Sequence, residues 1–288
     1  MSQSNDQASV YFRCPAKINL FLHIIGRLEN GYHALESVFR SVSLFDKITL
    51  TCRADGKISR SLGPESISPD DDLTVRAAHI LQQASGTTLG VDIRLTKCIP
   101  TGAGLGGGSS NAAGVLHHLN QLWDCKLAPD ALEKLALHLG ADVPFFLSGG
   151  DQFVQGIGEQ RAPIALPRAH YLILFPSVHC ATGPMFQSAA LNRSSAPLAA
   201  ELLTAAVLTP QDFLSDRFAN AFEALALAQH PEIASAKHWL VQQAGNARLS
   251  GSGSALFAQI FSEAHGKEIQ ARCPLPWQAW CVHSTATG

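Results

Sequence analysis

The most informative stretch of this chain is PTGAGLGGGSSN, residues 100–111, which contains five glycines. It separates a strand-like run at residues 91–99 from a helix-like run at residues 111–123. Because glycines carry no side chain, the backbone N–H groups of such a loop can surround a charged ligand. Ser109 or Ser110 is a suitable N-cap, and the helix that follows would point its positive dipole end at the loop. The stretch therefore predicts a phosphate-binding loop.

The residues expected to line the phosphates are Pro100, Thr101, Gly102, Ala103, Gly104, Leu105, Gly106, Gly107, Gly108, Ser109 and Ser110. A flexible glycine linker is the alternative interpretation, but linkers do not join a tight strand to an alanine-rich helix. A Walker loop is excluded because no lysine stands before the serines. The glycines also match the G-x-G-x-x-G pattern, but no second strand with an acidic end follows, so a dinucleotide-binding fold is rejected.

The composition is that of a globular protein with a proper core. The chain has 288 residues, of which 46% are hydrophobic and 15% charged, and its formal net charge is −2. It has no basic block for nucleic acid, and no apolar run reaches the ~18 residues that span a bilayer. Residues 1–9 lack the features of a secretory signal, and seven scattered cysteines indicate reduced thiols. We therefore expect a cytoplasmic protein with no membrane or nucleic-acid partner, and leave both monomer and homodimer open.

Strands and helices are predicted in mixed order along the chain. Strands are expected at residues 10–25, interrupted at Pro15, and at 34–44, 46–52, 91–99, 171–175, 256–261 and 277–283. Helices are expected at residues 73–84, 111–123, 129–139, 213–228, 232–244 and 262–272, with a variable, partly helical segment at 188–209. This mixture, arranged around two glycine-rich turns, predicts a two-lobed α+β enzyme. We place the domains at residues 1–160 and 161–288.

A lysine and an aspartate are the candidate catalytic pair. Lys17 and Asn19 share one face of the first predicted strand, in an apolar segment where polar side chains need partners. Taken alone, Lys17 is most simply a lysine whose ammonium group reaches solvent at a sheet edge. Asp142 follows the predicted helix 129–139, at an end where the dipole disfavours an anion, unless it is only a turn residue. If Lys17 and Asp142 met, the carboxylate would stay ionised, ready to accept or orient a hydroxyl proton.

An aromatic pair follows the turn signal at residues 30–31. Tyr32 and His33 together suit stacking on, and hydrogen bonding to, a planar base. A tyrosine that covers the end of a hairpin is the simpler alternative. His117 and His118 are interpreted as packing or surface residues and not as metal ligands.

Three segments, in order, resemble the motifs of the GHMP small-molecule kinases. They are residues 15–20 (PAKINL), the glycine loop 100–113 and residues 249–253 (LSGSG). Residues 17–39 and 139–145 are similar to one branch of this family, whose acceptor is a cytidine diphosphate-linked methylerythritol of non-mevalonate isoprenoid biosynthesis. The resemblance implies the two-lobed GHMP-kinase fold, with the active site in the cleft between the lobes, and a small-molecule substrate.

The resemblance also implies a role for individual residues. Asp142 matches the catalytic aspartate that takes the acceptor proton, and Lys17 matches the lysine that pairs with it. The residues expected to bind the acceptor are Asn19 in the pocket, Tyr32 and His33 on the cytosine, Phe186 as the opposing wall, Thr182 close by, and Gly251 and Ser252 of the third motif.

The implied reaction is a direct transfer of the ATP γ-phosphoryl group to an alcohol, with Mg²⁺. Ser109 or Ser110 is the candidate Mg²⁺ ligand by analogy. One alternative is a related kinase of the same fold that acts on mevalonate, homoserine or a sugar. Such an acceptor has no base for the aromatic pair to bind. Another is a non-catalytic ATP-binding sensor, which would tolerate the loss of Lys17 or Asp142.

The chain departs from the family pattern at two places. It has Asp72 where the family often has an asparagine before the leucine. It also has NAFE at residues 220–223, where an acidic residue often follows the asparagine. The missing acid is therefore not expected to be essential to the chemistry.

Overall fold

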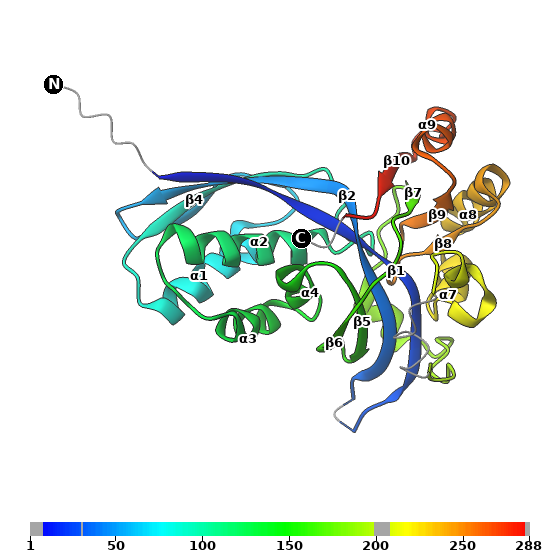
Figure 1. Ribbon diagram of the computed structural model, residues 1–288, viewed down its shortest axis with the longest axis horizontal. Helices are drawn as coiled ribbons and strands as arrows, with labels where there is room; N and C mark the ends of the chain where they lie inside the picture. Colours follow the sequence, from blue (N-terminus) through cyan, green and yellow to red (C-terminus); the bar gives the residue numbers. More distant parts are fainter. Residues whose placement is uncertain (1–7, 30, 199–207, 286–288) are drawn as a thin grey trace. The chain divides into compact units, whose positions relative to one another are not determined.

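The computed structural model describes residues 8–29, 31–198 and 208–285 (Figure 1). The chain forms two compact units, each assembled from separate stretches of sequence. The first unit contains Met1–Pro15, Phe45–Ile99 and Gly107–Ser148, and the second contains Ala16–Leu44, Pro100–Gly106 and Gly149–Gly288. Helices and largely antiparallel strands occur in both, which confirms the predicted α+β class. The glycine loop passes from the second unit to the first at residues 106 and 107.

In the first unit, helices cover one face of a small sheet (Figure 1). β4 (Gly90–Thr96) pairs antiparallel with the Lys47–Arg53 part of β2 (His33–Arg53) and parallel with β3 (Ile58–Leu62). The helices are η1 (Pro69–Asp71), α1 (Leu73–Ser85), α2 (Gly107–Leu122), α3 (Pro129–Leu139) and α4 (Val143–Ser148). Alternate apolar residues of β2 and β4 are buried against them and form the core of this unit.

Helix α1 shows how local sequence sets an element. The carboxylate of Asp72 caps it by accepting a hydrogen bond from the Thr74 amide at 2.8 Å. Gly86 ends it in the left-handed region, with φ of +69°. Arg60 also donates to the second oxygen of Asp72, at 2.5 Å. The helix predicted here is confirmed, and the aspartate at this position both caps the helix and pairs with Arg60.

The second unit contains an antiparallel sheet in the order β10-β7-β9-β8. Its strands are β7 (His170–Phe175), β8 (Arg248–Leu249), β9 (Leu256–Ile260) and β10 (Gln278–His283). The helices of this unit are α5 (Thr182–Gln187), η2 (Asp212–Leu214), η3 (Asp216–Phe218), α7 (Glu223–Gln229), α8 (Pro231–Ala244) and α9 (Glu263–Ala271). Apolar residues of α7, α8 and α9 pack with Leu172, Leu174 and Leu256 of the sheet into one core.

The same unit holds a second set of strand pairs. The Leu35–Phe39 part of β2 pairs antiparallel with β5 (Asp151–Gly156), which pairs with β6 (Gln160–Ile164). β1 (Ser9–Arg27) also pairs with β2. Both long strands have residues in each unit.

Several predicted boundaries are wrong. β1 runs through Pro15 without a break, which a strand tolerates where the missing N–H is not needed for pairing. β2 is a single strand where two were expected. The first half of the predicted helix 213–228 is not α-helical, because Phe213 and Phe218 pack against Phe21, with ring centroids 6.2 and 5.4 Å away. Tertiary packing overrides helix propensity there.

Other elements escaped the sequence prediction altogether. They are β3, β5, β6, β8, η1, α4 and α5. Most of them are short and lack the long apolar periodicity on which such predictions depend. Part of the segment predicted to be variable, residues 199–207, lies outside the described residues. Among the described residues, no helix is both long and apolar enough to cross a bilayer.

Candidate active site

Lys17 and Asn19 lie in the buried middle of β1. Their exposed fractions are 3% and 1%. Lys17 Nζ donates a hydrogen bond to Asn19 Oδ1 at 2.6 Å and lies 4.3 Å from the centroid of the Phe39 ring. Asn19 Nδ2 in turn donates to Ser37 Oγ at 2.9 Å. The simple interpretation of Lys17 as a lysine that reaches solvent is therefore wrong, because the ammonium group is held inside the protein.

The glycine loop is packed backbone against backbone. Gly102, Gly104 and Gly106 have φ of +66°, +75° and +69°, which favours glycine at each position. A Cβ on Gly104 would lie 2.2 Å from the Ser250 carbonyl oxygen. A Cβ on Gly251 would lie 3.1 Å from the Gly104 carbonyl oxygen. The glycines of the second and third motifs therefore allow these two backbones to touch.

The carbonyl and amide groups of the loop have different environments. The carbonyl oxygens of Leu105, Ala103 and Gly104 accept hydrogen bonds from the Lys17 amide, the Ala255 amide and the Ser250 hydroxyl, at 2.9, 3.0 and 3.0 Å. Within residues 8–29, 31–198 and 208–285, nothing accepts a hydrogen bond from the amides of residues 101–106. The loop thus uses its carbonyl oxygens to attach itself, while its N–H groups have no acceptor among the described residues, an arrangement typical of anion-binding loops.

The helix after the loop begins earlier than predicted. α2 starts at Gly107, so Ser109 and Ser110 lie in its first turn and are not its N-cap. Gly107 fits because a Cβ there would approach Lys97 Nζ and Ile99 to 3.0 Å. Ser110 Oγ is buried and has no hydrogen-bond partner among the described residues. A hydroxyl in this state is available to a ligand oxygen or a hard cation.

Sequence reasoning missed a charged pair beside this helix, in the first unit. The buried carboxylate of Asp46 accepts hydrogen bonds from the Cys98 and Ile99 amides at 2.7 and 2.9 Å and pairs with Lys97. Lys97 Nζ also donates to Asn111 Oδ1 in α2, at 3.2 Å. The pair fixes the entry to the glycine loop and places a cation beside the first turn of α2. The signal was Lys97 itself, an ionisable residue just ahead of the loop.

Hydrogen bonds to the NAFE segment, residues 220–223, hold the third motif, residues 249–253, in place. Asn220 Nδ2 donates to the carbonyl oxygens of Leu249 and Gly251 at 2.8 and 2.9 Å. Glu223 accepts from the Leu249 amide at 2.8 Å. Ser250 Oγ accepts from the Asn19 amide at 3.3 Å, which links this turn to β1. We call Lys17, Asn19, Ala103–Leu105 and Leu249–Ser252 the motif cluster, because hydrogen bonds join these segments directly.

The residues predicted to bind the acceptor substrate also lie in the second unit. We treat them and the motif cluster as the two elements of the candidate site. The His33 and Phe186 rings stack, with centroids 5.1 Å apart and planes at 25°, and Phe186 packs edge-on against Phe222. Tyr32 is 61% exposed. Thr182 shares a hydrogen bond with Ser252 of the motif cluster, at 2.8 Å between the hydroxyl oxygens. We call Tyr32, His33 and Phe186 the aromatic group.

Asp142 belongs to the first unit and Lys17 to the second. Asp142 directly precedes α4, a helix that the sequence did not predict. The C-terminal end of α3 disfavours the negative charge of Asp142, as expected, but the N-terminal end of α4 favours it. The pairing of Asp142 with Lys17 stays a prediction.

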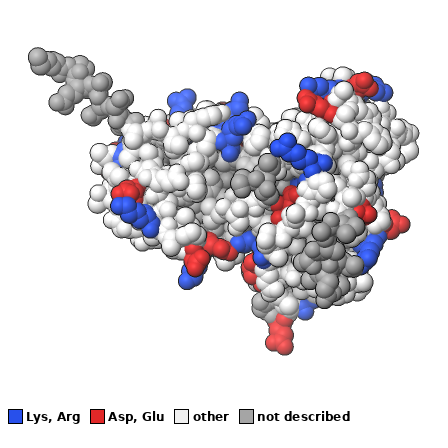
Figure 2. All heavy atoms as spheres, in the orientation of Figure 1, with Lys and Arg blue, Asp and Glu red and all other residues white. Residues whose placement is uncertain are grey.

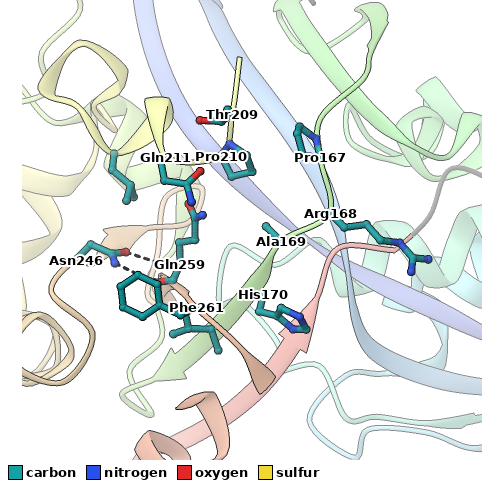
Figure 3. Close-up of a pocket in the computed structure, with 12 residues that line it drawn as sticks. Pro167, Arg168, Ala169, His170, Thr209, Pro210, Gln211, Asn246, Gln259 and Phe261 are labelled. Carbon is teal, nitrogen blue, oxygen red and sulfur yellow. Dashed lines mark hydrogen bonds between the residues drawn. The ribbon is translucent and has the colours of Figure 1, made fainter. Parts of the chain in front are cut away.

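A pocket of about 440 Å³ is present in the second unit (Figure 3). None of its lining residues belongs to the motif cluster or the aromatic group. On one wall, the Asn246 side chain exchanges hydrogen bonds of 2.9 Å with the Gln259 backbone, as the dashed lines show. Phe261, which is 91% exposed, also borders this pocket. The Asn246 amide and the Gln259 backbone of this wall are thus occupied within the protein, whereas Gln259 Oε1 is buried without a hydrogen-bond partner among the described residues.

Figure 2 shows the charged side chains on one face of the molecule. On the face shown in Figure 2, basic and acidic side chains of the described residues alternate without a broad patch of one sign. No group of three or more His, Cys, Asp or Glu among the described residues is placed to hold a metal ion. The use of Mg²⁺ and the absence of a nucleic-acid partner therefore stay predictions.

The chain is similar to known kinases over nearly its whole length. The family model of the GHMP kinases N-terminal domain matches residues 72–150, and that of the GHMP kinases C-terminal domain matches residues 190–278. A protein of Azoarcus sp. (strain BH72), named 4-diphosphocytidyl-2-C-methyl-D-erythritol kinase, is 44% identical over 94% of this chain and 93% of its own length. A protein of Aromatoleum aromaticum with the same name is 42% identical over 94% of this chain and 91% of its own.

Solved structures of kinases are also similar to this chain. A crystal structure of 4-(cytidine 5'-diphospho)-2C-methyl-D-erythritol kinase is 32% identical, with a TM-score of 0.82, and covers 96% of this chain and 100% of its own. The mevalonate kinase of Methanococcus jannaschii, at 14% identity and a TM-score of 0.71 over 97% of this chain and 99% of its own, shares the fold. The fold predicted from the three motifs is thus confirmed, and the chain belongs to the GHMP kinase family.

Proposed function

We propose that this chain transfers the γ-phosphoryl group of ATP to a hydroxyl of 4-diphosphocytidyl-2-C-methyl-D-erythritol, a step of non-mevalonate isoprenoid biosynthesis. The observation that carries the proposal is the motif cluster, in which hydrogen bonds join β1, the glycine loop and the third motif. The relatives named for this activity, at 42–44% identity over almost the whole chain, support the choice of acceptor.

The glycine loop is assigned to the ATP phosphates. Its amides at residues 101–106 and the start of α2 offer N–H donors and a positive dipole end to the negative oxygens. In a phosphoryl transfer most of the catalysis comes from positioning and from charge stabilisation, which such fixed dipoles supply. We assign the same role to residues 100–110 as a whole.

Lys17 and Asp142 are assigned to the acceptor hydroxyl. Asp142 would accept or orient its proton, and Lys17 would polarise its oxygen. The bond from Lys17 Nζ to Asn19 Oδ1 holds the ammonium group in one direction, so that it does not have to be ordered when substrate binds. Asn19 and Ser252 would line the acceptor pocket.

The first turn of α2 fits a hard cation bound with the nucleotide. Ser110 Oγ is buried and unpartnered among the described residues, and hydroxyl oxygen is a ligand type that Mg²⁺ accepts. Mg²⁺ there would neutralise charge that develops on the phosphate oxygens. A cytoplasmic location stays a prediction of the sequence.

The cytosine is assigned to the aromatic group. His33 and Phe186 stack on each other, with centroids 5.1 Å apart, which leaves no room for a base between them; Tyr32, which precedes His33 in the chain, is 61% exposed, and the base would stack on the outer side of this aromatic group. This feature favours the cytidine-linked acceptor over mevalonate, homoserine or a sugar, which carry no base.

The test is a coupled ADP-release assay with purified protein and three acceptors. We expect turnover with the cytidine-linked methylerythritol, and little or none with mevalonate or homoserine. CMP should compete with the acceptor and not with ATP. Turnover with mevalonate or homoserine alone would replace the proposed acceptor. ATP binding without turnover of any acceptor would indicate a nucleotide sensor instead.

A further inference from the structure

The Arg193 side chain connects the aromatic group to the segment that follows α5. Its Nε donates a hydrogen bond to His33 Nε2 at 3.0 Å. Its terminal nitrogens donate to the carbonyl oxygens of Phe186, Ser188 and Leu191 at 2.8, 2.7 and 3.2 Å. One guanidinium group therefore holds both the imidazole ring and the backbone that carries the Phe186 ring.

The chain around Arg193 is itself anchored. The Ser195 amide donates to the Ile24 carbonyl oxygen in β1 at 3.0 Å. The Leu198 amide donates to the buried carboxylate of Glu36 in β2 at 2.6 Å. The guanidinium group is therefore presented to His33 from a backbone that is hydrogen-bonded to β1 and β2.

Hydrogen-bond chemistry then fixes the proton of the imidazole. A guanidinium group can only donate, so His33 Nε2 must be the nitrogen that carries the lone pair. The proton of the neutral ring is consequently on Nδ1. Burial and the positive charges of Arg193 and Arg27 lower the pKa of His33 from its usual value, which keeps the ring neutral.

We propose that Arg193 is a positioning residue that sets base specificity by holding His33 as a neutral Nδ1–H donor. This inference rests on the proposed function, because it assumes that the aromatic group receives the base of the acceptor. A fixed donor complements the lone pair on N3 of cytosine, and it opposes the N–H that uracil carries at the same position. The site would therefore reject a uridine-linked analogue through the state of one imidazole.

The first experiment measures the His33 ring directly in the ligand-free, full-length protein. Histidine ¹⁵N chemical shifts, followed against pH, report both the tautomer and the pKa. In the wild type we expect the Nδ1–H tautomer and a pKa below the usual value. In Arg193→Met, which keeps an apolar stem but cannot donate, we expect mixed tautomers and a raised pKa. Arg193→Lys should restore the Nδ1–H tautomer in part.

Arg248→Met is the matched control. Arg248 also binds backbone carbonyls, those of Leu214 and Ser215 at 2.6 and 2.7 Å, but it does not contact His33. We expect its loss to leave the His33 shifts unchanged. A wild-type His33 that carries its proton on Nε2 would overturn the proposal. So would an Arg193→Met protein whose His33 shifts match those of the wild type.

The second experiment measures the binding of CMP and UMP by calorimetry. We expect the wild type to prefer CMP by about tenfold, the effect of one hydrogen bond, and Arg193→Met to lose most of that preference. In a His33→Ala background the Arg193→Met change should have no further effect on the ratio, since Arg193 acts through His33. ATP binding should not change in any of these variants.

The outcomes separate this inference from the proposed function. A wild type that prefers CMP, with an unchanged ratio in Arg193→Met, overturns the role of Arg193 and leaves the function standing. A wild type that binds neither nucleotide overturns the proposed acceptor, and the specificity with it. The ¹⁵N measurement needs no ligand, so it tests the fixed tautomer in either case.

Discussion

In the motif cluster backbone meets backbone, whereas in the aromatic group side chain meets side chain. Gly104 and Gly251 touch because neither has a Cβ, and the Ser250 hydroxyl and the Asn19 amide complete the contact. His33 and Phe186 instead rely on ring stacking and on Arg193. The first kind of site tolerates almost no change, because each added atom collides. The second can be varied residue by residue, which suits a part that selects one acceptor among many.

The largest effect should come from a single methyl group in the motif cluster. In Gly104→Ala the new Cβ would lie 2.2 Å from the Ser250 carbonyl oxygen, at a residue with φ of +75°. We expect a loss of about 3 kcal/mol or more in the free energy of unfolding, from overpacking and backbone strain together. Urea denaturation measures the stability, and the ADP-release assay should show nearly complete loss of turnover.

Gly245→Ala separates strain from collision. Gly245 has φ of +76°, and a Cβ there would meet no atom within 4 Å. It should cost only about 1 kcal/mol, the effect of the left-handed backbone alone. Equal losses of unfolding free energy in Gly104→Ala and Gly245→Ala would mean that the contact between Gly104 and Ser250 does not matter. The contrast drawn between the motif cluster and the aromatic group would then fail.

A change that leaves both site elements intact should remove the chemistry alone. Asp142→Asn keeps the shape of the side chain but cannot accept a proton, so kcat should fall by about 10² or more. The affinities for ATP and for the acceptor should hardly change. Asp130→Asn, an exposed residue in the first turn of α3, is the control and should behave as the wild type. An Asp142→Asn enzyme with near-normal turnover would refute the assignment.

The aromatic group should affect only the acceptor. Removing the ring in Phe186→Ala should raise KM for the acceptor about tenfold, since a base stacked on an aromatic ring contributes about 1–3 kcal/mol. KM for ATP should stay the same, and Phe186→Leu should fall between the two. Phe261→Ala is the control, because Phe261 is 91% exposed and belongs to neither site element. An equal rise in both KM values would show that the two site elements are not independent.

The difference between the two site elements also explains what the sequence could predict. The motif cluster is encoded in short runs of glycine and polar residues, so the sequence points to the loop, and the resemblance to the family motifs adds Lys17 and Asn19 as candidates. It does not identify Arg193, because the role of that residue depends on a contact with His33, 160 residues away. The Asp46–Lys97 pair was missed for the same reason. Helix α4 was missed because six residues hold too little periodicity to mark a helix.

The smallest effect concerns the pH at which these comparisons are made, because each unit holds a group whose pKa burial shifts to a value between about 4 and about 6. In the first unit, burial lowers the pKa of His118 to about 4. In the second, burial raises the pKa of Asp151 to about 6, although Arg40 partly offsets this. From about pH 4 to pH 6, folded His118 binds fewer protons than unfolded histidine, so its contribution to stability grows as the pH rises. Folded Asp151 binds more protons than unfolded aspartate, so its contribution falls over the same range.

The contributions of His118 and Asp151 should largely offset each other in the wild type over this pH range. Each is at most about 1.4 kcal/mol per pH unit, the value for one proton. Chemical denaturation at several pH values between 4 and 6.5 separates them. Relative to the wild type, the slope of stability against pH should become less positive in His118→Gln and more positive in Asp151→Asn. Curves of the same slope in both variants would mean that these buried groups do not set the pH dependence, and that the scaffold responds to pH through other residues.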